Sequence, residues 1–292
     1  MAPDTTDGTL EGLRGAATTE PVSGRDRWLH LGLVASIVLL SAPVLIAIVF
    51  STKGQADLAG VPTLSPGTNA IENYRDVIVD YNMGRYMLNS LVMAIVITVG
   101  KLVISLLAVL AIVYYEFPFQ NLAFFAILFT LMLPIPVRIV PLYDVMVTLG
   151  WTNSLWALTI PYLASATTVF ILRQHFLAIP DSLVENAKLD GVGPFRFLVF
   201  VLIPMSKGVL AGVAVIMFIH GWNQYLWPLL VINDNDLHVA QVGLTIIEDV
   251  ADTGQRPWHL MMAGAILTLL PPLALLVLAR KPLLQTFGLA HK

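Results

Sequence analysis

Long apolar stretches alternate with short polar segments along most of this chain. Six of these stretches reach or exceed the roughly 20 mostly apolar residues that a membrane-spanning helix needs, and they contain few or no Asp, Glu, Lys or Arg residues. The expected fold class is therefore all-α, a polytopic membrane protein. The predicted spans cover residues 28–50, 86–113, 119–140, 154–174, 207–231 and 258–280.

The composition agrees with a membrane protein, because 57% of the residues are hydrophobic and only 12% are charged. Soluble domains carry about 25% charged residues. The net charge of −3 gives no indication of nucleic-acid binding, and the absence of cysteine excludes thiolate chemistry. The 6 histidines are scattered without metal-ligand spacing, so no metal site is expected.

The distribution of basic residues predicts the orientation of the chain. With the N-terminus inside, 10 Lys and Arg residues fall on inner segments and 5 on outer ones, so the positive-inside rule favours cytoplasmic termini. We then expect a disordered cytoplasmic tail at 1–27, a membrane domain at 28–281 with a cytoplasmic loop at 176–206, and a cytoplasmic C-terminal tail at 282–292. The first apolar run is too long for a typical signal peptide and lacks a clear cleavage site.

The polar loop between the fourth and fifth spans has a recognisable internal pattern. Residues 181–190 can form a short amphipathic helix, for which Asp181 or Ser182 would be the N-cap. Gly191 permits the left-handed conformation that ends a helix, and a second helix through 195–202 would follow. Such a helix-turn-helix suits docking into a groove on another protein, although an ordinary interfacial loop is the alternative.

Fixed positions in this loop match a known motif. The motif is Glu-Ala-Ala, three residues, Gly, nine residues and Ile-x-Leu-Pro, which marks the permease subunits of ATP-driven bacterial importers. Asn186 replaces the first Ala, and Val201 replaces the Ile. The positions that fall at its spacing are Glu185, Ala187, Gly191, Ile203 and Pro204.

From residue 28 onward the chain resembles the carbohydrate-type ABC importer permeases, specifically the maltose-permease-like second membrane subunit. Within that group it is similar to the permeases of sn-glycerol-3-phosphate importers. The runs that carry this similarity are 131–139, 164–167, 173–174 and the Trp-rich 221–230. The resemblance implies the type I ABC importer permease fold and a multi-pass protein of the bacterial inner membrane.

The resemblance also implies partners and coupling residues. The complex would contain a homologous first permease, two copies of a cytoplasmic ATPase that bind ATP and Mg, and an extracytoplasmic binding protein that meets the outer loop at 232–257. The permease itself would need no cofactor, and lipid would surround it. Gly288 and Leu289 stand where this family often has a Gly-Leu pair. The residues expected to dock on the ATPase are Glu185, Asn186, Ala187, Asp190, Gly191, Ile203 and Pro204.

Polar and aromatic side chains inside the predicted spans are candidates for a translocation pathway. Lys101 lies near the middle of the second span, where a lysine costs about 2.5–3.5 kcal/mol on insertion scales, so it is expected to face protein or water. It would attract an anionic substrate, or it would instead bond to backbone carbonyls or snorkel. An aromatic belt is the alternative for the tryptophans. The candidates are Lys101, Arg138, Trp222, Asn223, Gln224 and Trp227.

Enzymatic chemistry has no support in the sequence. The chain contains no phosphate-cradling GxxxxGK[ST] loop, so it is expected neither to bind nor to hydrolyse ATP. A secondary transporter is a distant alternative, since no Asp or Glu lies well inside any predicted span, and a membrane enzyme lacks clustered catalytic residues. The expected substrate is glycerol-3-phosphate or a glycerophosphodiester, with a neutral sugar or oligosaccharide as the alternative.

Overall fold

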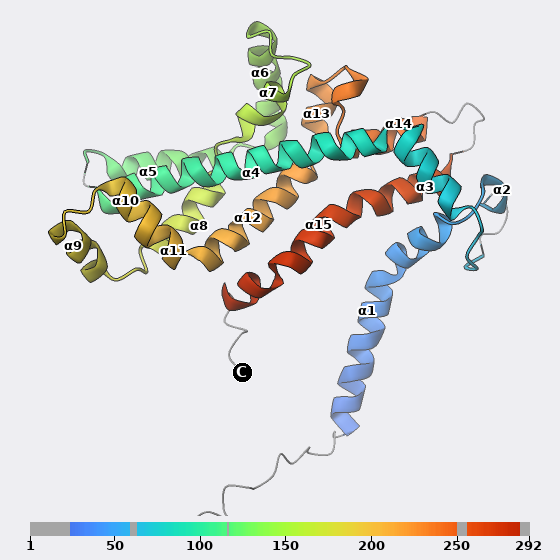
Figure 1. Cartoon of the computed structure of the whole chain (residues 1–292), viewed down its shortest axis with the longest axis horizontal. Coiled ribbons are helices and arrows are strands. Elements are labelled where there is room, and N and C mark those ends of the chain that lie inside the picture. Colours follow the sequence, from blue (N-terminus) through green and yellow to red (C-terminus); the bar gives the residue numbers. More distant parts are fainter. Residues whose placement is uncertain (1–23, 59–62, 116, 250–255, 287–292) are drawn as a thin grey trace, which may run out of the picture. The chain divides into compact units, whose positions relative to one another are not determined.

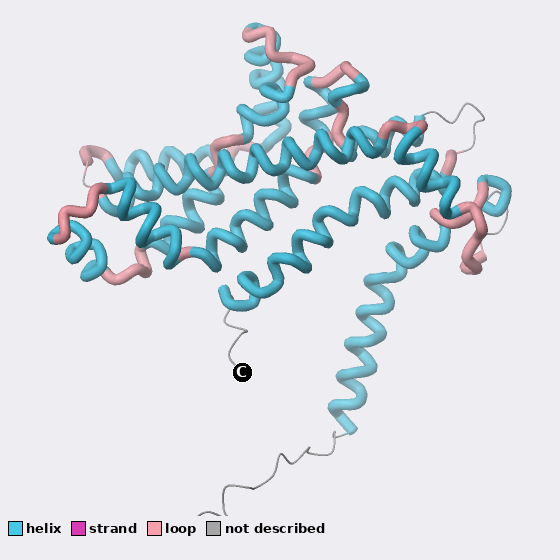
Figure 2. Tube along the Cα trace, viewed as in Figure 1, coloured by secondary structure: helices cyan, strands magenta, loops and turns pink. Residues whose placement is uncertain are grey.

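The computed structural model describes residues 24–58, 63–115, 117–249 and 256–286. All regular structure within these ranges is helical, and they contain no strand (Figure 2). The chain divides into two compact units, Met1–Ile46 and Ala47–Lys292. The first unit holds most of α1 (Gly24–Phe50), whose segment from Arg27 is long and apolar enough to cross a membrane.

The second unit is built around the long helix α4 (Met83–Tyr114). Helix α12 (Lys207–Trp222) packs along α4 in the opposite direction, and α15 (Trp258–Thr286) packs on α12 (Figure 1). Helix α8 (Ala166–Phe176) packs on α4 as well. The other helices are α2 (Gln55–Leu58), α3 (Ala70–Val79), α5 (Gln120–Phe129), η1 (Thr130–Met132), α6 (Ile135–Thr148), α7 (Leu155–Thr159), η2 (Ile160–Tyr162), α9 (Asp181–Leu189), α10 (Pro194–Phe197), η3 (Leu198–Leu202), α11 (Ile203–Met205), α13 (Leu226–Val231), η4 (Asn235–Leu237) and α14 (Ala240–Asp249).

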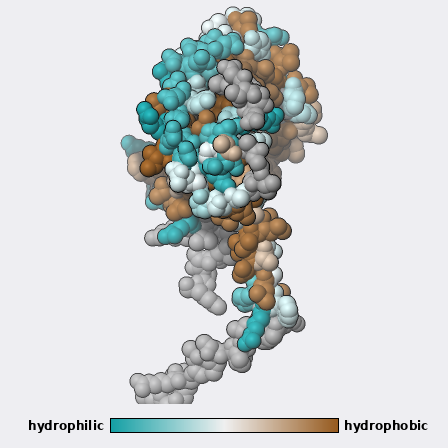
Figure 3. Space-filling model, turned by 90° about the vertical axis from the view of Figure 1, so that its right-hand side faces the viewer, coloured by the Kyte–Doolittle hydropathy of each residue, from teal (hydrophilic) through white to brown (hydrophobic). Residues whose placement is uncertain are grey.

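The two ends of this unit differ in character. The α3 end is formed by α3, α14 and the start of α4, and the α9 end is formed by α9, α10 and the end of α4 (Figure 1). Hydrophilic residues gather over the α3 end, while hydrophobic residues cover part of the flank (Figure 3). Helix α3 lies in the segment between the first two predicted spans.

Only some of the predicted spans are single helices. Among the described residues three helices are long and apolar enough to cross a membrane, namely Arg27–Phe50, Met83–Tyr114 and Trp258–Arg280. Three more candidates are bent pairs, Gln120–Met132 with Pro136–Thr148 (101°), Leu155–Tyr162 with Ala166–Phe176 (41°) and Pro194–Met205 with Lys207–Trp222 (85°). Counting each pair as one span gives six, the number expected from the sequence.

Three predicted spans were therefore wrong as continuous helices. The run 154–174 breaks between η2, which ends at Tyr162, and α8, which begins at Ala166. The run 119–140 breaks at Leu133, which is extended (ψ 113°) because Pro134 follows it and disfavours the helical conformation there. The run 207–231 breaks after Trp222, and α13 resumes at Leu226. Pro228 lies within α13 and does not itself break the run.

Residues outside the spans also acquire order at the α3 end. Asn73 donates from its Nδ2 to the carbonyls of Ser51 and Lys53, both at 2.8 Å. Lys53 is buried and donates to Thr63 Oγ1 at 2.8 Å, so its charge is held against the loop that follows. The tails predicted at 1–27 and 282–292 lie outside the described residues except where α1 begins at Gly24 and α15 continues to Thr286.

A close approach between α4 and α12 depends on a glycine. A Cβ added at Gly221 would lie 3.1 Å from the Cα of Ala94, a backbone atom that cannot move away independently. The close approach lets Trp222 become fully enclosed, with 1% of its surface exposed. A residue without a side chain at position 221 is thus needed for α4 and α12 to pack at this distance.

We expect Gly221→Val to destabilise the folded chain by about 1–3 kcal/mol, the usual cost of overpacking. Thermal unfolding of the purified full chain in detergent measures the change. Gly193→Val is the matched control, because Gly193 is extended (φ −68°) and no heavy atom lies within 4 Å of its added Cβ. Equal midpoints for the two variants would contradict the close contact.

Candidate functional site

The loop between α8 and α12 has the geometry that the sequence predicts. Helix α9 covers Asp181–Leu189, and Gly191 follows it with φ +68°, the left-handed conformation expected there. The amide of Val192 donates to the carbonyl of Ala187 at 2.9 Å, which closes the end of the helix. Both the helix and its stop signal are confirmed.

Helix α9 begins within one residue of the predicted start. Ser182 is the second residue of α9 rather than its cap, and the amide of Leu183 donates to the carbonyl of Pro180 at 3.1 Å. Pro180 therefore holds the position before the first helical residue.

The motif residues divide into an exposed set and an anchoring set. Ala187 and Ile203 are partly buried and pack against the hydrophobic cluster at the α9 end. Glu185 makes no hydrogen bond or ion pair with any other side chain that the structure describes. The exposed motif residues are Glu185, Asn186, Asp190, Gly191 and Pro204.

A single hydrophobic cluster attaches this loop to the long helices. We call it the coupling cluster, and it joins residues of α4, α5, α8, α9 and the 194–205 segment. Tyr114 donates from its hydroxyl to the carbonyl of Phe176 at 3.2 Å, and its ring meets that of Phe197 edge-on at 5.4 Å. Its buried members are Leu106, Val109, Leu110, Ile112, Phe124, Val169, Leu172, Phe176, Ile179, Val184, Phe197, Leu198 and Leu202.

Lys101 is buried in α4, with 4% of its surface exposed. It forms neither a hydrogen bond nor an ion pair with any residue in the described ranges. Its electrostatic neighbour is His220 in α12, a residue that the sequence analysis missed. Ser105, one turn along α4, is also fully buried, and its Oγ has no partner among the described residues.

Gln224 is a second polar group enclosed in the apolar interior. It follows the end of α12 and exposes 9% of its surface, and both atoms of its amide are buried without a partner in the described part of the chain. Neighbouring Asn223 is exposed, and its Oδ1 accepts from Gln241 Nε2 at 3.3 Å. The described residues contain no cluster of three or more His, Asp and Glu side chains suited to a metal ion.

The two tryptophans of the candidate set are held by packing and hydrogen bonds. Trp222 Nε1 donates to the carbonyl of Thr268 at 3.0 Å, and Trp227 Nε1 donates to the carbonyl of Ala157 at 2.9 Å. Both are almost fully buried, at 1% and 2% exposure. Arg138 is exposed on α6. The tryptophans therefore tie helices together, an arrangement that fits the interior better than an aromatic belt.

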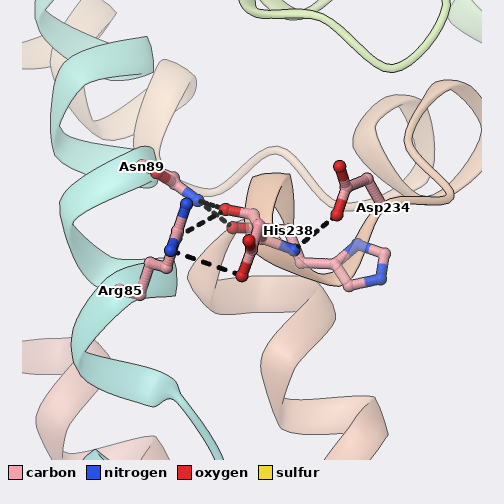
Figure 4. A network of polar contacts seen from close by, with 5 residues as sticks. Arg85, Asn89, Asp234 and His238 are labelled. Carbon is pink, nitrogen blue, oxygen red and sulfur yellow. Dashed lines mark hydrogen bonds and ion pairs between the residues drawn. The ribbon is translucent and has the colours of Figure 1, made fainter.

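At the α3 end, α4 holds the loop that precedes α14. Asn89 donates from its Nδ2 to the carbonyls of Asp236 and His238, both at 2.9 Å, and Arg85 Nε donates to the carbonyl of Asp236 at 2.9 Å (Figure 4). Arg85 also pairs with the Asp236 carboxylate at 3.3 Å. Because both side chains of this pair are more than half exposed, the ion pair contributes only about 0–1 kcal/mol. The backbone acceptors are therefore the stronger constraint on the loop.

His238 is the histidine of this loop, which covers residues 233–239. Its ring is 9% exposed, lies edge-on to Tyr86 at 5.9 Å, and has a buried Nδ1 without a partner in the described ranges. Burial lowers the pKa of His238 below its ordinary value of 6.5, and the nearby Asp234 carboxylate partly opposes this shift. The observed conformation of the 233–239 loop, which we call the closed loop, consequently favours the neutral form of the His238 ring.

The chain belongs to the family of binding-protein-dependent transport system inner membrane components, whose model matches residues 102–283. It is thus a multi-pass permease subunit of an ABC importer of the inner membrane and not an enzyme; ATP hydrolysis resides in a separate subunit of the complex. This agrees with the class expected from the loop motif.

Relatives include three proteins named sn-glycerol-3-phosphate transport system permease protein UgpE. The protein of Rhizobium meliloti is 42% identical over 86% of this chain and 92% of its own length. That of Pectobacterium atrosepticum is 41% identical over 88% and 94%, and that of Escherichia coli O1:K1 / APEC is 41% identical over 86% and 92%.

A solved structure has the same fold. It is a chain of a bacterial ABC transporter involved in the import of the acidic polysaccharide alginate, with a TM-score of 0.76. The match covers 91% of this chain and 98% of that one, at 19% sequence identity. At that identity the likeness supports the shared permease fold alone.

The lowered pKa of His238 predicts a pH dependence of the 233–239 loop. The closed loop is fully stabilised above pH 6.5, the ordinary histidine value, and loses stability as the pH falls below it, because the open loop then binds a proton that the closed loop excludes. Amide hydrogen exchange of Ala240, whose N–H donates to Ser90 Oγ, measures loop opening, after correction for intrinsic exchange rates.

His238→Gln is the control for this experiment, since glutamine does not titrate. The variant should show the same protection of Ala240 on both sides of pH 6.5. If wild-type protection stays constant as the pH falls to about 5.5, one unit below the ordinary value, the buried histidine does not control the loop.

Proposed function

We propose that this chain is the second permease subunit of an importer for sn-glycerol-3-phosphate. The proposed substrate rests on one observation, the 41–42% sequence identity to proteins of that name over more than 85% of the chain. The complex contains a homologous first permease, two copies of a cytoplasmic ATPase with its ATP and Mg, and an extracytoplasmic binding protein. Glycerophosphodiesters share the phosphoester group and are candidate substrates of the same importer.

In this proposal both termini and the α9 end face the cytoplasm. The excess of Lys and Arg on the predicted inner segments supports this orientation. The hydrophilic α3 end then faces the binding protein, and the loop held by Arg85 and Asn89 is presented to it on the fixed start of α4.

The ATPase docks on the exposed face of α9 and the turn after it. Leu189 and Phe195 expose 85% and 67% of their surfaces beside the exposed motif residues, so apolar and charged groups are presented together. Val184 and Ala187 face the coupling cluster on the other side of α9. A displacement of α9 by the ATPase therefore reaches α4 and α8 through packed side chains.

The proposed pathway passes the polar groups enclosed near the middle of α4 and the end of α12. Lys101 lacks a counter-ion among the described residues, and a phosphate group would supply one. Gln224 offers an amide donor and acceptor that no described residue uses. His220 adds a third polar group close to Lys101, whereas Arg138 on α6 stands further outward along the same proposed route.

Transport in a defined system tests the substrate. The chain is reconstituted in proteoliposomes with the permease, ATPase and binding protein that co-purify with it, and uptake of labelled sn-glycerol-3-phosphate is compared with that of glycerophosphocholine and maltose. ATP-dependent uptake of the phosphoesters alone supports the proposal. Uptake of maltose without either phosphoester overturns it.

Gly191→Pro is expected to uncouple ATP hydrolysis from import. Proline is restricted to φ near −65° and cannot adopt the +68° that Gly191 has, so the turn after α9 cannot form. Uptake should fall at least tenfold in proteoliposomes while membrane insertion and ATP hydrolysis persist. Gly193→Ala is the control, because its φ of −68° suits alanine. Normal uptake by Gly191→Pro would refute the role of the turn.

Lys101→Met is expected to lower phosphoester uptake while stabilising the chain. Methionine preserves much of the volume and removes a charge that costs about 2.5–3.5 kcal/mol at a helix centre. We expect about a tenfold loss of uptake, equivalent to about 1.4 kcal/mol, together with a higher unfolding midpoint in detergent. Lys101→Arg should keep most of the uptake. Unchanged uptake by Lys101→Met would remove Lys101 from the pathway.

A further inference from the structure

The chain changes direction sharply between the coupling loop and α12. The segment Pro194–Met205 meets Lys207–Trp222 at 85°, and Ser206 is the residue between them, with φ −101° and ψ 10°. The cause is local: the wide turn of η3 (Leu198–Leu202) comes just before Pro204, whose nitrogen carries no hydrogen to donate. We call Ser206 with this bend the α12 hinge.

A hydrogen bond connects the α12 hinge to the residue at the other end of the coupling loop. His175 Nε2 and Ser206 Oγ lie 3.0 Å apart, a hydrogen bond between residues 31 positions apart in sequence. Ser206 is 1% exposed, and His175 stands in the last turn of α8. The whole of α9 lies between these residues in the chain, so the bond joins the two ends of the coupling loop.

The backbone around Ser206 is itself well bonded. The amide of Ser206 donates to the carbonyls of Leu202 and Ile203, at 3.0 and 3.1 Å, and its carbonyl accepts from Leu210 at 2.8 Å. The hydroxyl is therefore not needed to hold the local backbone. Its only described partner outside its own turn is His175, which belongs to a different helix.

We propose that the His175–Ser206 hydrogen bond is the positioning contact that makes α8 and α12 respond together when α9 moves. This inference rests on the proposed coupling role of α9. The coupling cluster attaches α9 by apolar contacts, which are non-directional and allow sliding. The hydrogen bond fixes the angle at the α12 hinge, so that the hinge cannot absorb the displacement of α9 by bending. Without the bond, α9 moves while α12 stays behind, and hydrolysis proceeds without import.

The test compares variants in the complete importer, reconstituted in proteoliposomes. Import of sn-glycerol-3-phosphate per ATP hydrolysed is measured for Ser206→Ala, His175→Ala and the double variant, together with hydrolysis in the absence of the binding protein. We expect each single variant to lower the ratio about three- to tenfold, the range that loss of one hydrogen bond produces, and to raise the unstimulated hydrolysis. The double variant should be no worse than either single one.

Conservative variants separate positioning from folding. Ser206→Thr retains the hydroxyl and His175→Gln retains a donor near the place of Nε2, so both should keep a ratio close to that of the wild type. Ser51→Ala is the matched control, because Ser51 is also fully buried and bonded across the chain, to Tyr74 at 3.1 Å, but lies at the α3 end. It should change the thermal stability and leave the ratio unaltered.

Additive losses in the double variant, or an unchanged ratio in both single variants, would overturn the inference. If Ser206→Ala does not assemble, His175→Ala against His175→Gln decides the outcome alone. If the wild-type importer takes up no sn-glycerol-3-phosphate, the substrate proposal fails. The unstimulated hydrolysis still tests the pair, since an unchanged rate in both single variants overturns it without any substrate.

Discussion

Inside a bilayer every backbone N–H and C=O must find a partner within the protein, and much of this structure follows from that requirement. A continuous helix such as α4 meets it along most of its length. Three candidate spans instead bend by 41° to 101° at short breaks. Broken backbone at membrane depth is tolerated only where protein surrounds it or water reaches it.

Hydropathy predicted how many spans to expect and which segment carries the coupling motif, but not where the spans bend. An apolar run looks the same whether its helix is straight or folded back. Pro134 and Pro204 are visible in the sequence, but a proline alone does not predict the size of the 101° and 85° bends found beside them. Gly191 was predictable because its left-handed conformation is a local property of one residue.

The candidate site was predicted unevenly for the same reason. Lys101 stood out because a charge within an apolar run is rare, and it is indeed buried. The sequence could not show that Trp222 and Trp227 donate to distant carbonyls, or that His220 lies close to Lys101. His175 and Ser206 are ordinary residues at the edges of a loop, and only the fold brings them together across 31 positions.

The length of α4 makes its orientation dependent on the thickness of the surrounding lipid bilayer. Its 32 residues extend about 48 Å at 1.5 Å per residue, whereas the hydrocarbon layer is about 30 Å thick. A helix of this length must lean or emerge from the layer, and the thickness of the layer sets by how much. The 233–239 loop is bonded to one end of α4, and the coupling cluster packs at the other end. The tilt of α4 therefore changes the distance between these two sites along the membrane normal. Membrane thickness thus sets the inclination of α4 and, through it, the separation of these two sites across the membrane.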